Sequence, residues 1–507
     1  MEKEYNAILE QGTFTVVPRP SGRKIVGSTW VLRIKSGTPP LYKARLCARG
    51  FSQLPGLDYD ETYAPTVSRT ALRTVLALSV VFDMKLHVVD CKNAFLNGSI
   101  DREIYLEQPQ YMVKSGTTSK SHVWKLNKAL YGLKQAPWIW NLTLHNALTD
   151  AGFKRMHYEP CIYVRSLDKV KNGIPDHSLV ILAVYVDDIT IAAMSEEGLI
   201  FAKSSISKIF AIKDEGEASK IIGIEIARIK KGLILHQTEY ADSVLTRFGM
   251  EECKSVATPM ERNFRLVPKE SGEPFIGNSL YRQQVGAILY AATCTRPDLC
   301  IAVNICSRFV EDPAERHYAA LKRILRYLRG TKDLGLRYVS NSKHLCITGY
   351  SDSDFAGDVT DSKSTSGFVI EINGCPVSWK STKQKCVSTS TVEAEYIACS
   401  LACKEVIWLR YLTEEILGFS LETTPILFTD NSGAKQLAHN NAISDKLKHI
   451  RNSYHFVREC VKDGLLDLQY VPTAANPADM MTKPLDRVKL QGHLERIKMT
   501  SAGPAQK

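Results

Sequence analysis

The strongest constraint on the fold is a β-rich apolar run that two aspartates interrupt. Residues 179–186 form the run, Asp187 and Asp188 follow, and residues 189–192 resume it. Two such segments on either side of a short polar break are typical of a β-hairpin. The pattern predicts a hairpin with two carboxylates at its tip, although aspartate is also common in plain turns.

A second segment supplies a third carboxylate. Residues 63–82 have a helical pattern, and residues 86–90 then predict a short buried strand that ends in Asp90. Two buried strands that deliver three carboxylates to one end of a sheet favour a divalent-cation site, because hard cations prefer oxygen ligands.

The N-terminal segment is basic in one stretch. Residues 11–57 contain eight basic residues and no acidic one, against a net charge of +11 for the whole chain. Four of them follow strand-like alternation, which would place them on one surface: Arg33, Lys35, Lys43 and Arg45. This surface is either a solvated sheet face or one that suits phosphates.

A helix is predicted from Asp312 to Gly330, with a capping-box start and a glycine stop. One of its faces is apolar, and another carries Lys322, Arg326 and Arg329, joined by Arg323. The basic face is either solvated or rests on a nucleic-acid backbone.

The last third has the pattern of a separate α/β domain. Strands are predicted near 345–351, 367–372, 375–380, 425–429 and 465–471, with a long helix from about residue 390. Asn373-Gly374 predicts a type I′ turn between the second and third strands, because both residues tolerate a positive φ.

Acidic residues recur at the ends of these elements. Asp352 closes the first strand, Glu393 and Glu395 open the helix, Asp430 closes the fourth strand, and Asp479 lies near the terminal helical segment. A two-metal site needs several carboxylates that converge on ions about 3.5–4 Å apart. The helical pattern does not choose between the two glutamates.

Several motifs in this order resemble those of a Ty1/copia-type retrotransposon reverse transcriptase, over nearly the whole chain. The motifs lie at residues 43–51, 89–98, 130–137, 185–188, 295–298 and 350–354, and at 483–485. The resemblance implies a multidomain α+β and α/β fold, a right-hand polymerase with fingers, palm and thumb or connection, followed by a ribonuclease H-like domain. The implied divisions are residues 1–237 for fingers and palm, 238–340 for thumb and connection, 341–487 for ribonuclease H, and a polar, poorly ordered tail at 488–507.

The resemblance also implies the site residues. The polymerase carboxylates would be Asp90, Asp187 and Asp188. The ribonuclease H carboxylates would be Asp352, Glu395, Asp430 and Asp479, with two Mg²⁺ ions in each active site. The family favours Glu395 over Glu393, and Asp352 over Asp354.

The same resemblance predicts which other positions contact the substrate. Lys43 and Arg45 are the expected triphosphate ligands, and Gln135 is expected near the incoming nucleotide. Phe95 resembles the steric gate that blocks a ribose 2′-hydroxyl, with core packing as the alternative. Trp138 departs from the family pattern, which has a basic residue there.

The expected function is RNA-directed DNA synthesis with ribonuclease H cleavage of RNA–DNA hybrids. RNA template, DNA primer and deoxynucleoside triphosphates would be the partners, together with capsid and integrase proteins of the element. The alternatives are a catalytically silent nucleic-acid-binding remnant or host-adopted copy, and an inactive partner subunit.

Composition fits this expectation. The apolar runs are shorter than the about 18 residues that a membrane helix needs, and the thirteen cysteines lack Cys-x-x-Cys spacing. We expect a soluble cytoplasmic protein, in a virus-like particle or the nucleus, with no membrane contact. No zinc knuckle, protease or integrase pattern is visible, so the chain reads as a C-terminal portion of a polyprotein.

Overall fold

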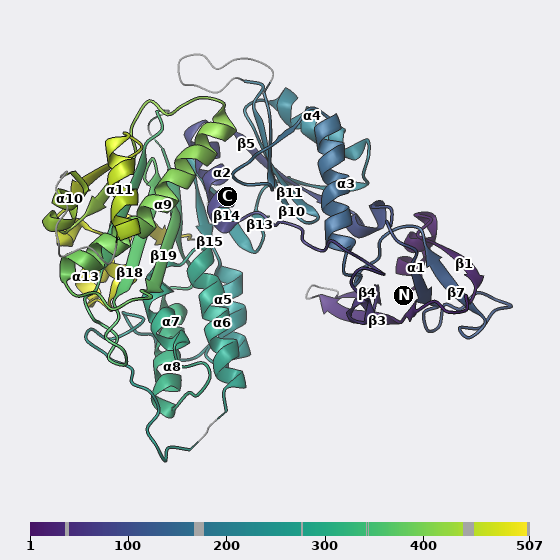
Figure 1. Ribbon diagram of the computed structural model, residues 1–507, viewed down its shortest axis with the longest axis horizontal. Helices are drawn as coiled ribbons and strands as arrows, with labels where there is room; N and C mark the ends of the chain where they lie inside the picture. Colours follow the sequence, from purple (N-terminus) through teal and green to yellow (C-terminus); the bar gives the residue numbers. More distant parts are fainter. Residues whose placement is uncertain are drawn as a thin grey trace.

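Five β-sheets organise the chain in the computed structural model (Figure 1). The structure describes residues 1–503, except residues 36–39, 167–176, 275–276, 341, 343 and 440–450. In the part described, no helix is long and apolar enough to cross a membrane, and all thirteen cysteines are free.

The N-terminal part combines a four-stranded sheet with a two-stranded ribbon. The sheet has the order β1 (Phe14–Pro18), β7 (His122–Leu126), β6 (Tyr105–Glu107), β2 (Ile25–Val26), and the ribbon pairs β3 (Ser28–Lys35) with β4 (Leu41–Ala48). The helix α1 (Glu2–Glu10) and the short turns η1 (Gly50–Ser52) and η2 (Ala94–Asn97) complete this part. Its core includes Trp124, whose ring stacks on Phe14 with centroids 3.5 Å apart.

The second sheet is antiparallel and carries the predicted hairpin. Its order is β12 (Ile212–Glu217), β5 (Lys85–Cys91), β11 (Asp188–Ala193), β10 (Val180–Tyr185), β9 (Ile162–Arg165), β8 (Lys154–Arg155). The helices α3 (Ala136–Asp150) and α4 (Glu196–Ser207) pack on one face. The helix α2 (Arg69–Val81) packs on the other face, in a core that continues into the rest of the molecule.

The strand and the hairpin predicted for this sheet are confirmed, and the helix is shorter than predicted. It begins at Arg69, because the Ser68 hydroxyl accepts a hydrogen bond from the Ala71 N–H at 3.1 Å and caps the first turn.

The third sheet joins segments that are far apart in the sequence. Its order is β13 (Lys220–Ile221), β14 (Ile224–Ile229), β15 (Gly232–His236), β16 (Leu334–Val339), β22 (Met499–Ser501). The helices beside it are α5 (Thr238–Arg247), α6 (Ser279–Cys294), α7 (Cys300–Ser307) and α8 (Glu315–Gly330), with the turn η3 (Pro297–Leu299).

The prediction of a poorly ordered tail at 488–507 is wrong for the described residues 488–503. The helix α13 (Arg487–Arg496) and β22 occupy this segment, and β22 pairs with β16 in the register Met499↔Leu336. The cause is a set of apolar side chains that the sequence reading overlooked, since Leu490, Leu494 and Ile497 are all buried.

The helix predicted from Asp312 begins three residues later, at Glu315. The Asp312 carboxylate pairs with Lys269 at 2.7 Å and does not cap the helix. The cap is made instead by Nδ1 of His317, which accepts a hydrogen bond from the Ala314 N–H at 2.7 Å.

The C-terminal sheet confirms the predicted strands and their α/β pattern, but this part is not separate, because its core is continuous with that of the second and third sheets. Its order is β19 (Cys375–Lys383), β18 (Thr365–Ile372), β17 (Ile347–Ser353), β20 (Ile426–Thr429), β21 (Asp467–Tyr470). The pairs among β19, β18 and β17 are antiparallel, and those from β17 through β20 to β21 are parallel. The predicted turn is present, with φ of 49° at Asn373 and 72° at Gly374.

The long helix α9 (Thr391–Leu417) crosses this sheet (Figure 1). The other elements of this part are α10 (Ser432–His439), α11 (Arg451–Lys462), η5 (Thr473–Ala475) and α12 (Asp479–Thr482).

One buried arginine ties three parts of the molecule together. Arg73 on α2 is 3% exposed, and its guanidinium lies 3.8 Å from the ring centroid of Trp379 on β19. The same group donates to the carbonyl oxygens of Val377, Thr293 and Cys294, each at 2.8 Å. The second sheet, the α6 helix and the C-terminal sheet therefore share one core.

Candidate active sites

The first carboxylate group lies where β5 meets the β10–β11 hairpin. Asp188 and Asp90 are direct partners across the antiparallel ladder, so their side chains leave the same face of the sheet. Asp187 lies at the tip, where its carbonyl oxygen accepts a hydrogen bond from the Cys91 N–H at 2.8 Å. The structure thus brings together all three carboxylates predicted for the first site.

The tip of this hairpin is held by a tryptophan. Val186 has a φ of 57°, a conformation that costs a β-branched residue free energy. Its carbonyl oxygen accepts a hydrogen bond from Nε1 of the buried Trp140 on α3 at 2.7 Å. Trp140 therefore fixes the residue that precedes Asp187.

Asp90, Asp187 and Asp188 are half-buried. Burial, then the nearby Asp187 and Glu215, raise the pKa of the Asp90 carboxyl, whereas Lys43 lowers it. Carboxylates that disfavour one another's charge in this way are suited to a cation, which relieves the repulsion. The oxygen donors and their repulsion fit Mg²⁺.

The basic face of the ribbon lies near this group. The register pairs Arg33 with Lys43 and Val31 with Arg45, so the three basic side chains share one face of β3–β4, as the alternation predicted. The opposite face is apolar, with Leu32 66% and Ile34 69% exposed. Since Lys43 lowers the pKa of Asp90, the basic face is within electrostatic reach of the carboxylates.

Two aromatic rings connect this face to the predicted steric gate. The Arg45 guanidinium lies 4.0 Å from the ring centroid of Tyr131, and the Tyr131 ring packs edge-on against Phe95 with centroids 4.9 Å apart. Phe95 is half-buried and contacts two hydrophobic cores. The structure therefore gives Phe95 a packing role and leaves it partly accessible.

The ribbon is attached through a close approach of two backbones. A Cβ on Gly132, which has a φ of 90°, would lie 2.2 Å from the carbonyl oxygen of Ala48, and a Cβ on Gly50 would lie 2.0 Å from that of Gly132. Only glycine permits this contact. The Ala48 N–H donates to the Tyr131 carbonyl oxygen at 2.7 Å across it.

Gln135 lies in the interior, with no exposed surface. Its Oε1 accepts from Nε2 of Gln53 at 3.0 Å, and its Nε2 donates to the Asp58 carbonyl oxygen at 2.8 Å. Each end of the amide makes one hydrogen bond within the protein, and because Gln135 has no exposed surface, a direct contact with a nucleotide would require its surroundings to move.

The second carboxylate group is tighter and more buried. Asp352 is the last residue but one of β17, Glu395 lies in the first turns of α9, and Asp430 follows β20. One carboxylate oxygen of each lies within 4.8 Å of the others, and in the described part of the chain only this trio of acidic, histidine or cysteine side chains meets that spacing. The structure therefore brings together three of the four residues predicted for the second site.

The fourth predicted residue, Asp479, lies beside this trio. It is buried at the start of α12, and its carboxylate forms an ion pair with Lys483. Met481 and Thr482 precede Lys483 on this segment. Met481 is buried, and the Thr482 hydroxyl donates a hydrogen bond to the carboxylate of Asp352.

Charge is costly in this second group. Burial raises the pKa of Asp352 to about 7, against the pull of Lys483 and with the help of Asp479 and Asp430. Burial and the nearby Asp352 and Asp430 raise the pKa of Glu395 to about 9. Oε2 of Glu395 is buried without a hydrogen-bond partner. Hard oxygen donors with an unsatisfied buried oxygen fit a divalent cation.

The structure separates the two pairs of acidic residues between which the family resemblance chose, Glu395 against Glu393 and Asp352 against Asp354. Glu393 is occupied as a cap, because its Oε2 accepts from the N–H and the hydroxyl of Thr389, each at 2.7 Å. Asp354 accepts a hydrogen bond from the Thr365 N–H and lies outside the trio.

The basic face of α8 has a different role from either sequence reading. Arg326 and Arg329 donate from Nε to the carbonyl oxygens of Lys254 and Glu251, each at 2.7 Å. Arg323 pairs with Glu261 at 2.9 Å. These three side chains therefore hold the segment 251–261 against the helix, and Lys322 remains exposed.

Sequence reasoning missed three positioning residues: Trp140, Tyr131 and Lys483. Trp140 has no role among the sequence-based predictions, although the N–H of a buried tryptophan usually finds a hydrogen-bond partner. Tyr131 and Lys483 lie inside quoted motifs, but nothing in the spacing shows which groups they meet.

Comparison with known proteins identifies the family. Residues 11–262 match the family described as reverse transcriptase (RNA-dependent DNA polymerase). The chain is 37% identical over 99% of its length to the Pol polyprotein of transposon TNT 1-94 from Nicotiana tabacum, and 38% identical over 100% to that of transposon RE1 from Arabidopsis thaliana.

The chain spans 38% and 34% of the length of these two plant polyproteins. It also covers 100% of a putative transposon Ty5-1 protein of Saccharomyces cerevisiae, at 32% identity over 63% of its own length. The order of motifs, the paired aspartates of the second sheet and these relatives agree: the chain belongs to the reverse transcriptase family of Ty1/copia-type transposon Pol polyproteins.

Proposed function

We propose that the chain is an RNA-directed DNA polymerase that also cleaves the RNA strand of RNA–DNA hybrids. The observation that carries the polymerase is the direct pairing of Asp188 with Asp90 at the end of the sheet, with Asp187 beside them and the basic ribbon face within reach. Family membership supports the same reaction.

The polymerase residues have distinct tasks. Asp90 and Asp187, with Asp188 beside them, would hold two Mg²⁺ ions, which when bound activate the attacking oxygen and stabilise the leaving group. Lys43 and Arg45 bind the triphosphate. The primer 3′-hydroxyl loses its proton to water and its oxygen bonds to the α-phosphorus, while the bond from that phosphorus to the bridging oxygen of the β-phosphate breaks and pyrophosphate leaves with that oxygen.

Positioning residues hold this geometry. Trp140 fixes the hairpin tip through the Val186 carbonyl. Tyr131 contacts both Arg45, which lies over its ring, and Phe95, which packs edge-on against it, so that the wall facing the sugar and the cation facing the phosphates are set together. Positioned groups of this kind contribute to rate because little reorganisation is needed when charge develops.

The hydrolytic site is supported by the Asp352, Glu395 and Asp430 trio. These residues would hold the ions at which water attacks the phosphodiester. Asp479 and Lys483 adjust the charge of the trio, since Lys483 lowers and Asp479 raises the pKa of Asp352.

We place both sites in a right-hand arrangement. The ribbon and the four-stranded sheet would be fingers, the six-stranded sheet the palm, α5–α8 the thumb and connection, and the C-terminal sheet a ribonuclease H-like domain. Template RNA, primer and deoxynucleotides are the proposed substrates. Capsid and integrase proteins are the proposed partners, in cytoplasmic particles or the nucleus.

The test is primer extension on an RNA template with Mg²⁺, followed by the fate of the labelled RNA. Incorporation of deoxynucleotides with shortening of the RNA is expected. A folded protein that binds primer-template and incorporates nothing would be a silent binding remnant, and the proposal would fail.

A further inference from the structure

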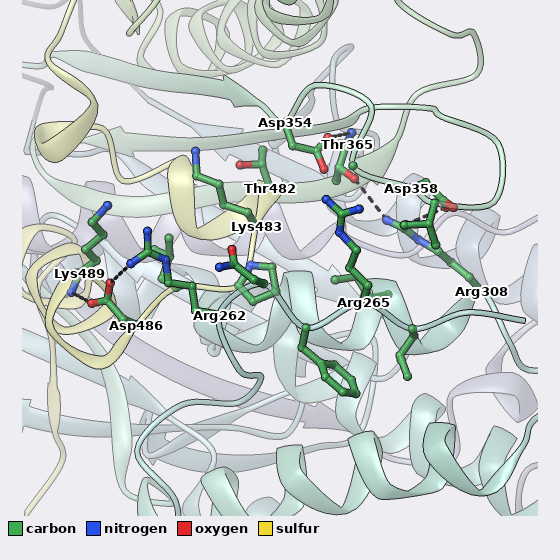
Figure 2. A pocket seen from close by; sticks show the side chains of 18 of the residues that line it. Arg262, Arg265, Arg308, Asp354, Asp358, Thr365, Thr482, Lys483, Asp486 and Lys489 are labelled. Carbon is green, nitrogen blue, oxygen red and sulfur yellow. Dashed lines mark hydrogen bonds and ion pairs between the residues drawn. The ribbon is translucent and has the colours of Figure 1, made fainter.

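A cavity of about 280 Å³ adjoins the second carboxylate group. Its walls come from two regions that are far apart in the chain: the segment 262–266 and the end of α7 on one side, and the C-terminal sheet with residues 482–489 on the other (Figure 2). We call it the 262–489 pocket. No residue of the first carboxylate group lines it.

The pocket is rich in basic side chains. Its basic lining residues are Arg262, Arg265, Arg308, Lys483 and Lys489, and its acidic ones are Asp354, Asp358 and Asp486. The acidic groups are engaged locally. Asp358 pairs with Arg308 at 2.8 Å and with Lys383 at 2.5 Å, Asp354 accepts from the Thr365 N–H, and Asp486 caps α13 by accepting from the Lys489 N–H at 3.0 Å.

Two of the cations lack an ion pair within the described residues. Arg265 and the Lys489 ammonium are exposed and make no contact shorter than 4.0 Å with a carboxylate there, and Arg262 meets Asp486 only at 3.6 Å. Figure 2 shows the Arg265 guanidinium extending between Lys483 and Arg308 toward Asp354. The pocket therefore offers positive charge that the protein does not neutralise.

The segment that carries Arg262 and Arg265 is held in place. It follows directly on residues 251–261, which Arg323, Arg326 and Arg329 bind to α8. The basic face of α8 thus positions a second set of cations at the pocket.

The pocket lies next to the carboxylate trio, although no residue of the trio lines it. Thr482 and Lys483 line it, while Thr482 donates to Asp352 and Lys483 pairs with Asp479. A duplex carries one negative charge per about 1.7 Å of its axis, so a duplex with one phosphate at the trio has further phosphates next to it on this side.

We propose that the 262–489 pocket binds backbone phosphates of the RNA–DNA hybrid beside the cleavage position, and that Arg262 and Arg265 thereby make the middle region of the chain part of the hydrolytic substrate site. This inference rests on the proposed hybrid cleavage. The basic side chains of the pocket could pair with phosphates of either the RNA or the DNA strand.

The test compares Arg265→Gln with Lys489→Gln in the full chain. Both residues are exposed, and thermal unfolding checks that each variant is folded. The matched control is Arg487→Gln, which removes an exposed cation from the same helix as Lys489 but outside the pocket. Binding of a labelled hybrid is measured at several salt concentrations. All variants carry Asp430→Asn as well, so that the hybrid is not cleaved during the measurement.

Each pocket variant should lower the slope of log affinity against log salt by about one. In the chain with intact Asp430, the KM for hybrid cleavage should rise with kcat unchanged, and DNA synthesis at saturating primer-template should be unaffected. The control should match the parent. Slopes and KM equal to the parent's in both pocket variants would overturn the proposal.

Hybrids with uncharged methylphosphonate linkages identify the strand. The difference between parent and Arg265→Gln should disappear when the contacted strand is the neutralised one, and its persistence with either strand neutralised would contradict phosphate binding. A parent that binds hybrid with the expected slope but never cleaves it would refute the hydrolytic function and leave the binding result standing.

Discussion

The two carboxylate groups differ in how much water reaches them. Asp90, Asp187 and Asp188 are half-buried at a hairpin tip, whereas Asp352 is 1% and Glu395 7% exposed. Water stabilises the charge of the first group in the absence of a cation. In the second group, protons must do so, which is why the pKa values of Asp352 and Glu395 rise to about 7 and about 9.

This difference in exposure goes with a difference in how the two groups are assembled. The open group at the hairpin tip depends more on what binds there, because its carboxylates do not meet the 4.8 Å spacing of the trio and the cations near Asp90, Lys43 and Lys213, lie on two other strands. The closed trio is already assembled by its own fold. The predictions below test whether the two groups act independently.

The largest effect is expected for Asp430→Asn. The change removes one charge from the trio, so the remaining carboxylates should not hold two cations, and hybrid cleavage should fall by roughly 10³-fold or more. DNA synthesis should continue, measured as primer extension on the same RNA, with the product left as a hybrid. Loss of both activities in a folded variant would mean that the two groups are not independent.

Asp187→Asn is the reciprocal change. It keeps the side-chain volume and removes a charge from the hairpin tip, so primer extension should fall by roughly 10³-fold, while cleavage of a preformed hybrid persists. Extension at the parent rate would show that the Asp187-Asp188 pair is only a turn.

Phe95→Val tests the open group more finely. Loss of the ring should make room beside the sugar and raise ribonucleotide use relative to deoxynucleotide use by about 10-fold to 200-fold, the range that steric fit in a pocket provides. The readout is the ratio of kcat/KM values. An unchanged ratio with full activity would assign Phe95 to packing against Tyr131 alone.

The pH dependence of stability should distinguish the groups in the absence of Mg²⁺. The folded-state pKa of Glu395 is raised from 4.5 to about 9, so between these values the folded state binds more protons than the unfolded state and stability falls as pH rises. Thermal unfolding from about pH 5 to about pH 9 should show this fall, and Mg²⁺ should counteract it most at the alkaline end.

The matched variants are Glu395→Gln, which should flatten this fall, and Asp90→Asn, which should leave it. A fall that Glu395→Gln does not change would show that Glu395 is not its source.

The smallest effect is expected for Trp140→Phe. It removes one hydrogen bond to the Val186 carbonyl, a contact that contributes about 0.5–1.5 kcal/mol, so primer extension should drop by up to about tenfold without a change in cleavage. The control is Trp138→Phe, two residues away, which has no such bond in the described structure. Equal losses in both variants would point to general loosening of α3.

Local patterns were sufficient for the framework of both sites. The hairpin of residues 179–192, the strand that ends at Asp90 and the Asn373-Gly374 turn are all present, because alternation, β-branched residues and turn residues act over a few positions. Bringing Asp352, Glu395 and Asp430 together depended on the family, because parallel pairing of β17 with β20 joins segments about eighty residues apart.

Contacts between distant segments explain the other differences. The basic face of α8 looked free because the sequence does not show that residues 251–261 fold back onto it. Gln135 was expected near the incoming nucleotide from the family resemblance, and the sequence does not show that its amide bonds to Gln53 and Asp58, which lie far away in the chain. Charge alone does not reveal whether the protein itself is the partner.

Because β22 comes late in the sequence, the third sheet is completed only late in the synthesis of the chain. Until residues 499–501 leave the ribosome, β16 ends the third sheet as an open edge, and open edges are templates for pairing with other chains. A nascent or prematurely terminated chain would therefore expose the edge of β16, which could pair with strands of other chains. Chaperone protection during synthesis, and the placement of any C-terminal fusion, should therefore affect the yield of folded protein.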